Sequence, residues 1–152
     1  MLKLVKLLVI IAWLALIFCA SQMPLPPANP TYQPTWFDYI FDKDMHALLF
    51  GVLSILICAF LTDFSFGKAK NKLSFWRVFY IAVFFCFAYG ITDEYHQGFV
   101  AGRDVSYYDL LFDVIGGGAG AVVYFVFNNA KFIKSKLSQN SNYSKSKSKS
   151  KI

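Results

Sequence analysis

The sequence predicts an all-α polytopic membrane protein: a bundle of four transmembrane helices with both termini in the cytoplasm. Of its 152 residues, 57% are hydrophobic and 16% are charged, whereas a soluble domain carries about a quarter charged residues. Four apolar segments each approach the length of about 20 residues that a helix needs to cross a bilayer. The connections between these segments alternate between basic and acidic, which indicates one orientation.

The four predicted spans cover about residues 4–21, 45–62, 74–92 and 107–128. The first carries no charge after Lys6, and the third holds only Arg77, near its start. The fourth contains Asp109 and Asp113 but is uncharged from there to Ala130. We therefore assign residues 1–130 to a single transmembrane domain.

The first span is predicted to be a retained helix. Lys3 and Lys6 precede an apolar core, as they would in a secretory signal peptide. However, Phe18, in the sequence Phe18-Cys19-Ala20, puts a bulky side chain where signal cleavage needs a small one. Proline stops helices, and four prolines then end this span: Pro24, Pro26, Pro27 and Pro30.

Lysine and arginine are abundant at the N-terminus, between spans two and three, and beyond span four. The other two connections are mainly acidic, with only Lys43 before span two and only Arg103 before span four. Basic connections stay in the cytoplasm. The two acidic connections are therefore predicted to face outward.

Residues 131–152 are predicted to form a disordered, basic cytoplasmic tail. Seven of the 15 basic residues lie in it, and it ends in SKSKSKSKI, which is polar and repetitive. A topology anchor is the favoured role, and association with anionic lipid is the alternative. Nucleic-acid binding is not expected, because aromatic residues are not interleaved with the charge.

No cofactor and no metal site are predicted. Cys19, Cys58 and Cys86 lie far apart in apolar segments, without the C-x-x-C spacing of many metal and redox sites. A metal site with His46 and carboxylates as ligands is chemically possible, but the chain lacks the H-x-x-x-H-type spacing that would indicate one. The thiols are expected to pack as small apolar side chains.

Ionisable residues gather at the predicted outer ends of spans two, three and four. A charge at the bilayer centre costs at least about 2.5–3.5 kcal/mol, so such residues usually face the bundle interior and are often functional. Lys43 and His46 share one helix face, as do Asp109 and Asp113. The candidate catalytic residues are Glu94, Asp93, Asp109 and His46. The candidate ligand-binding or structural polar network is Lys43, Gln97, Arg103 and Asp113.

The alternative for this set is an ion-paired network that only fixes the register of the helices. His96 is expected to be interfacial and structural, and Asp104 to lie in a solvated loop. Gly116 and Gly120 form a G-x-x-x-G helix-packing motif. A contact within the chain, with span two or three, is favoured over dimerisation.

Several short motifs follow one another in a fixed order. They are Phe18-x-x-Ser21-Gln22-x-Pro24, Lys43 with His46, Asp93-Glu94-x-x-Gln97, Gly102-Arg103, and Asp109 with Asp113 and Gly116. Their order and spacing resemble the VanZ-like family of bacterial integral membrane proteins, over nearly the whole chain up to Asn128. The resemblance implies a multi-pass protein of the bacterial cytoplasmic (inner) membrane. It also implies a link to low-level teicoplanin resistance, the phenotype of the founding member.

Asp113 departs from the family pattern, which usually has asparagine at this position. An aspartate can replace an amide donor only when it is protonated, or when a cation pairs with it. A mechanism that uses the amide therefore does not transfer directly to this chain.

Three functions stay open from the sequence, and proton-coupled transport by Asp109 and Asp113 is a weaker fourth, because four short helices leave little room for alternating access. The first is an envelope protein whose outward polar pocket binds a cell-wall-associated ligand or the glycopeptide. The second is a membrane enzyme whose carboxylates do acid–base work on a lipid-linked phosphate held by Arg103 and Lys43. The third is a non-catalytic assembly protein that packs through its glycine face. The expected surroundings are the lipid bilayer, and the oligomeric state is left open.

Overall fold

The computed structural model describes residues 2–22, 35–63, 75–103 and 105–149, with side chains described as far as Ala130. Its helices are α1 (Leu2–Ser21), α2 (Trp36–Asp63), α3 (Phe75–Gln97) and α4 (Tyr107–Lys149). Each contains a segment long and apolar enough to cross a membrane, and the described residues contain no strand. The predicted all-α bundle of four spans is confirmed, and the chain is a multi-pass membrane protein.

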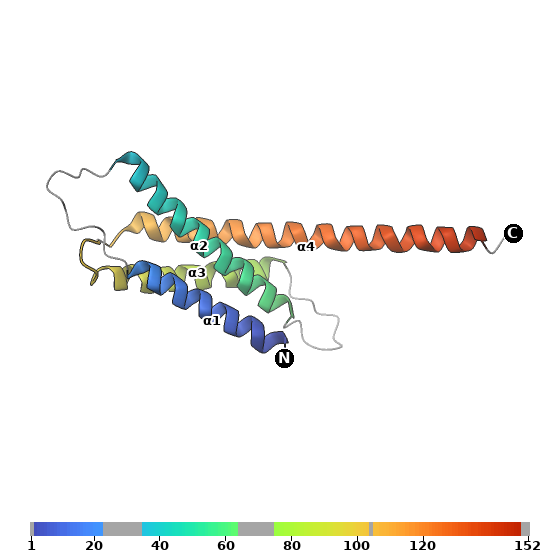
Figure 1. Ribbon diagram of the computed structural model, residues 1–152, viewed down its shortest axis with the longest axis horizontal. Helices are drawn as coiled ribbons and strands as arrows, with labels where there is room; N and C mark the ends of the chain where they lie inside the picture. The colour runs from blue at the N-terminus through green and yellow to red at the C-terminus, as the bar shows by residue number, and fades with distance from the viewer. Residues whose placement is uncertain (1, 23–34, 64–74, 104, 150–152) are drawn as a thin grey trace.

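Successive helices run in opposite directions, so the start of α1 and the C-terminal extension of α4 leave the bundle at the same end (Figure 1). At that end Lys6 Nζ of α1 lies 2.5 Å from Asp63 Oδ2 of α2. The opposite end is formed by the last turns of α1 and α3 and the first turns of α2 and α4. We call this opposite end the polar end.

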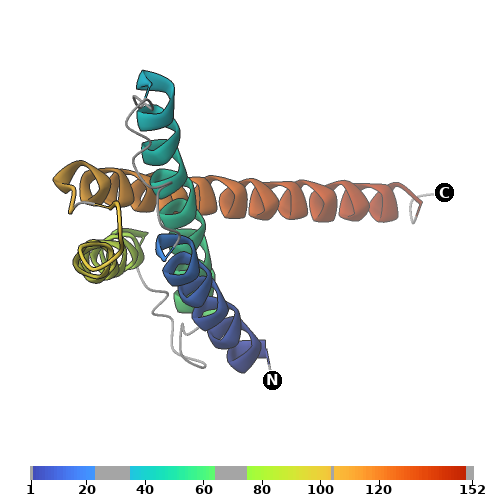
Figure 2. The ribbon, with the colours of Figure 1, turned by 60° about the vertical axis from the view of Figure 1, so that its left-hand side comes forward.

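Helix α2 packs against all three other helices and crosses α4 (Figures 1 and 2). Glycine makes this crossing close, because a Cβ atom on Gly116 would lie 2.1 Å from the backbone oxygen of Ala47. A Cβ on Gly120 would lie 2.1 Å from the backbone oxygen of Gly51. The G-x-x-x-G face of α4 is therefore covered by α2 of the same chain. A partner chain could not use this face without displacing α2.

Two helices extend beyond the predicted spans at the polar end. Helix α2 begins at Trp36, nine residues before the predicted span, because Thr35 and Asp38 cap it reciprocally. The Thr35 N–H donates to Asp38 Oδ2 at 2.8 Å, and the Asp38 N–H donates to Thr35 Oγ1 at 3.3 Å. Helix α3 continues to Gln97, which places the whole Asp93-Glu94-x-x-Gln97 motif on helix.

Helix α4 continues past the predicted span to Lys149, through the segment that the sequence predicts to be disordered. No glycine or proline follows Gly120, so no residue type that typically ends a helix interrupts this segment. The tail's disorder in solution stays a prediction, since a polar helix without packing partners is marginal in water. The proline-rich connection, the lysine-rich connection at 64–74 and Asp104 lie outside the described residues.

The apolar core lies in the middle of the bundle, where side chains from all four helices meet. Its fully buried members include Ile17 of α1, Phe50 of α2, Val78 of α3 and Ala121 of α4. Many large apolar side chains remain exposed on the outside of the helices, as expected for surfaces that contact lipid.

Candidate functional site

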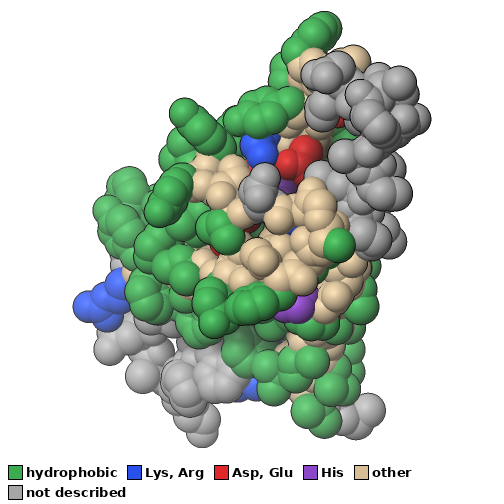
Figure 3. Space-filling view, turned by 90° about the vertical axis from the view of Figure 1, so that its left-hand side faces the viewer, with side chains coloured by type: hydrophobic (Ala, Val, Ile, Leu, Met, Phe, Trp, Pro, Cys, Tyr) green, Lys and Arg blue, Asp and Glu red, His purple; other side chains and the backbone are tan. Residues whose placement is uncertain are grey.

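Buried polar side chains concentrate at the polar end of the bundle. Figure 3 looks at this end and shows charged groups and histidine in the middle of a largely hydrophobic surround. Among the described residues, every buried polar or charged side chain except Ser54 belongs to this end. We call these residues the polar cluster: Ser21, Lys43, His46, Asp93, Glu94, Gln97, Asp109 and Asp113.

Two polar side-chain contacts, one turn apart, join α2 to α4. Lys43 Nζ pairs with Asp109 Oδ1, and His46 Nδ1 lies 3.0 Å from Asp113 Oδ1. Lys43 and His46 are three residues apart on α2, and Asp109 and Asp113 are four residues apart on α4. Because the two helices run in the same direction, each residue of the first pair can lie opposite one residue of the second. Lys43 also lies 3.1 Å from Asp42 Oδ2, at the exposed rim. The two helices thereby form one charged face in the bundle interior.

A second network joins α1 to α3. Ser21 Oγ donates to Asp93 Oδ1 at 2.6 Å, and Gln97 Nε2 donates to Asp93 Oδ2 at 2.9 Å. Arg103 Nη1 then donates to Gln97 Oε1 at 3.3 Å and lies 3.9 Å from Asp42 Oδ1. Both carboxylate oxygens of Asp93 therefore accept hydrogen bonds, and Arg103 connects this network to the rim of α2.

Glu94 lies between the two networks. Its Oε2 accepts the backbone N–H of Ser106 at 2.7 Å, just before α4 begins. Its Oε1 is buried and has no hydrogen-bond partner among the described residues, and the same is true of Asp113 Oδ2. One ligand atom each from Glu94, His46 and Asp113 lie within 4.8 Å of one another. Glu94 and Asp113 thus each keep one carboxylate oxygen free to accept a proton or to bind a cation.

Gly90 makes room for Asp113. A Cβ atom on Gly90 would lie 2.7 Å from Asp113 Oδ2 and 2.9 Å from Leu110 Cδ1. Any larger residue at position 90 would push this carboxylate out of its place. The close approach of α3 to α4 therefore depends on glycine here.

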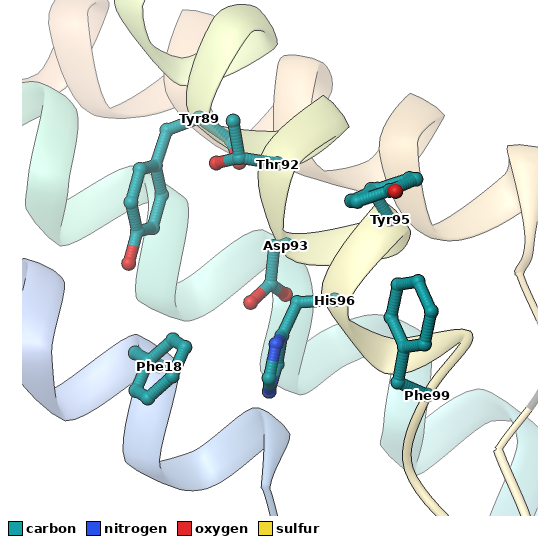
Figure 4. Close-up of a pocket in the computed structure, with 7 residues that line it drawn as sticks. All are labelled: Phe18, Tyr89, Thr92, Asp93, Tyr95, His96 and Phe99. Atoms are coloured by element: carbon teal, nitrogen blue, oxygen red, sulfur yellow. The ribbon is translucent and has the colours of Figure 1, made fainter.

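A cavity of about 290 Å³ lies beside the polar cluster, between α1 and α3. Figure 4 shows Phe18 of α1 facing His96 and Asp93 of α3, with Tyr89 deeper along α3. The His96 ring lies 4.5 Å from the Phe18 ring, centroid to centroid, and its Nε2 is 2.7 Å from Gln22 Nε2. His96 therefore lines this cavity and lies on a different face of α3 from Glu94.

A larger apolar groove of about 500 Å³ lies next to this cavity, between α1, α2 and α3. The two spaces share Tyr89 and Thr92 as lining residues. The rest of the groove is lined by apolar side chains such as Leu14, Ile57 and Phe85. A mainly aromatic cavity that contains Asp93 and His96 thus lies next to an apolar groove, an arrangement that suits an amphiphilic molecule.

The structure gathers all eight sequence-predicted residues of the catalytic and polar-network sets at the polar end. Seven of them are buried, and Arg103 is half-buried beside them. Sequence reasoning assigned no site role to Ser21, Asp42, Gly90 or Ser106. A helix-capping pattern signals Ser106, whose Oγ accepts the Asp109 N–H at 3.3 Å. No local pattern points to Gly90, whose role depends on a contact 23 residues away.

The model of the VanZ/LLP1 family matches residues 6–128, from the first turns of α1 to the end of the described spans. The chain belongs to the VanZ/LLP1 family. The match covers the polar cluster and both glycines of the α4 packing motif. No curated protein and no solved structure matches this chain significantly. The family assignment therefore adds no ligand or reaction, and both must be argued from the site.

Proposed function

We propose that the polar cluster of this VanZ/LLP1 protein binds the polar group of a lipid-linked, cell-wall-associated ligand on the outer face of the bacterial cytoplasmic membrane. Through that binding the protein contributes to envelope function and to resistance against teicoplanin-type glycopeptides. The observation that carries the proposal is the burial of seven ionisable or amide side chains from three helices at one end of a membrane bundle. Intramembrane ionisable groups are costly, and they usually serve a function.

The apolar groove supports a lipid-linked ligand over a soluble one. A soluble glycopeptide fragment would need only the cavity beside the polar cluster, whereas a lipid-linked molecule would also place its chain between α1, α2 and α3. Tyr89 and Thr92 line both spaces, so a chain in the groove would lie next to the cavity at the polar end. The acidic connections support the outward orientation of that end.

Resistance measurements test the proposal. The wild type, Glu94→Gln and Arg103→Ala are expressed at equal levels in a sensitive bacterial host, and the minimal inhibitory concentration of teicoplanin is measured. Gln at position 94 can still accept the Ser106 N–H, so this variant removes the charge and keeps the hydrogen bond. We expect wild-type protein to raise the inhibitory concentration severalfold and both variants to lose this effect.

Asp44→Asn is the matched control, because Asp44 lies on the same end of α2 with an exposed side chain. It should retain wild-type resistance, while membrane insertion and protein level are checked by immunoblotting. Equal resistance from all four proteins would reject the proposal.

A membrane enzyme is the second candidate, and the free carboxylate oxygens of Glu94 and Asp113 favour it. A carboxylate without a hydrogen-bond donor is able to take a proton from an attacking water, while Arg103 and Lys43 hold a phosphate. Protein in nanodiscs should then hydrolyse undecaprenyl-type phosphate or diphosphate substrates, and Glu94→Gln should not. An absence of turnover, with and without divalent cations, would leave binding as the function.

A further inference from the structure

We propose that His46, Glu94 and Asp113 form a binding site for one divalent metal cation of the Mn²⁺ or Zn²⁺ type. Each residue comes from a different helix, namely α2, α3 and α4. One ligand atom from each lies within 4.8 Å of the other two. This site goes beyond the proposed function, because cation binding does not require the envelope ligand.

Two buried, unpartnered oxygens point to a missing ligand. Asp113 Oδ1 lies within hydrogen-bond distance of His46 Nδ1, but Asp113 Oδ2 has no hydrogen-bond partner among the described residues. Glu94 Oε2 accepts the hydrogen bond from the Ser106 N–H, and Glu94 Oε1 likewise has no partner among those residues. Asp113 is 0% exposed and Glu94 is 4% exposed, so bulk water does not hydrate these oxygens. Buried polar atoms in proteins are normally bonded, and each exception needs an explanation.

The chemistry and the spacing both fit a divalent ion. An imidazole and two carboxylates are ligands that Mn²⁺ and Zn²⁺ accept, and the two carboxylate charges balance the charge of the ion. Around a tetrahedral ion with ligand bonds of about 2.0–2.2 Å, the ligand atoms lie about 3.3–3.6 Å apart. The separations here reach no more than 4.8 Å, so the three side chains would have to move toward a shared ion only by an amount that rotamer adjustment can supply.

A second set of possible metal ligands has similar spacing but already contacts a lysine. It consists of Asp42, His46 and Asp109. Lys43 Nζ pairs with Asp42 and with Asp109, so the Lys43 ammonium already neutralises the carboxylates of this second set. Neither Glu94 nor Asp113 pairs with a lysine or arginine among the described residues. The observations therefore favour the His46, Glu94 and Asp113 set.

A bound cation would also resolve a charge problem in the proposed function. Four buried carboxylates at the polar end would repel a phosphate. A divalent ion between two of them would supply the positive charge that a phosphate oxygen needs. The metal site thus makes the cluster suitable for an anionic headgroup.

Manganese binding tests the proposal directly. The full chain is reconstituted in phosphatidylcholine nanodiscs, treated with EDTA and titrated with Mn²⁺, while electron paramagnetic resonance measures the free ion. We expect one saturable Mn²⁺ per chain in the wild type and at least a tenfold loss of affinity in Glu94→Gln and Asp113→Asn. Asp44→Asn removes the same charge at an exposed position and should change the affinity less than twofold.

Spin-echo modulation of the bound Mn²⁺ detects a nitrogen ligand, and its wild-type result does not depend on whether any variant folds. The chain has two histidines. Wild type and His96→Gln should both show ¹⁴N coupling, and His46→Gln should lose it. The proposal is overturned by absent Mn²⁺ binding up to about 1 mM, the weak end of protein cation sites, by unchanged affinity in the carboxylate variants, or by wild-type Mn²⁺ without ¹⁴N coupling. These readouts use no antibiotic, so they separate failure of the metal site from failure of the proposed function.

Discussion

Lys43 is a buried cation whose two partners differ in their surroundings. Its pair with Asp109 lies in the bundle interior, and its pair with Asp42 lies at the rim, where the Asp42 side chain is 39% exposed. Removing one partner of a buried ion pair leaves an uncompensated charge, which costs far more than losing an exposed pair. The relative stability of variants at Lys43 and Asp109 therefore shows which of the two charges loses its last partner.

Lys43→Met is expected to destabilise the protein more than Asp109→Asn does. The first variant leaves Asp109 charged and buried without Lys43, at a cost of about 3–5 kcal/mol. The second leaves Lys43 its 3.1 Å pair with Asp42, so the cost should be smaller. Unfolding in mixed micelles, followed by circular dichroism, measures the difference.

The double variant Lys43→Met/Asp109→Asn removes both charges and should recover most of the stability lost by Lys43→Met. A double variant as unstable as the sum of the two single variants would show that the pair acts through packing, not charge.

Helix α4 presents its glycines to three different surroundings. Gly116 and Gly120 lie against the backbone of α2, and Gly117 lies against Cys86 of α3. Gly118 points elsewhere, and a Cβ there would come no closer than 3.9 Å to its nearest neighbour, Phe79. A run of adjacent glycines therefore contains both close-packed and open positions.

Gly120→Ala is expected to lower stability by about 1–3 kcal/mol, because its methyl group would overlap the Gly51 backbone and force the helices apart. Gly118→Ala adds the same methyl group where there is space, and alanine favours helix over glycine by about 1 kcal/mol. It should therefore be neutral or stabilising. Thermal unfolding of both variants in the same detergent compares them, and equal loss of stability would contradict the α2–α4 contact.

At the scale of the whole molecule, the four antiparallel helices place both chain ends on one side of the bundle and the polar cluster on the other (Figure 1). This arrangement is compatible with the charge distribution of the connections. The polar cluster would then be reachable from outside the cell, where the cell wall and glycopeptides are found.

Cysteine labelling in intact cells tests this orientation. Ala101→Cys, in the exposed connection between α3 and α4, should react with a membrane-impermeant maleimide before the cells are opened. Ser138→Cys, in the C-terminal segment, should react only after permeabilisation. The unsubstituted protein is the control, because it measures the labelling of the three native cysteines: Cys19, which is exposed on α1, and Cys58 and Cys86, which are buried. The reverse labelling pattern would place the polar cluster in the cytoplasm.

The class of the protein and its four spans follow from the sequence, because hydropathy over about 20 residues is a local property that the bilayer enforces. The sequence also identified Lys43, His46, Glu94 and Asp113 as residues of interest, because ionisable groups at membrane depth are rare. Helix ends were less well predicted: the start of α2 depends on the Thr35–Asp38 cap, which an apolar pattern does not reveal.

Which of these residues contact one another is seen in the folded bundle and not in the sequence. His46 and Asp113 are 67 residues apart in sequence and 3.0 Å apart in space, and Gly116 and Gly120 permit the close crossing that brings α2 to α4. Pairing across helices depends on their crossing and axial register, and no spacing within one helix encodes either. The same reason explains why the sequence offers no diagnostic spacing for the proposed metal site: its three ligands would come from three helices, and no local motif contains them.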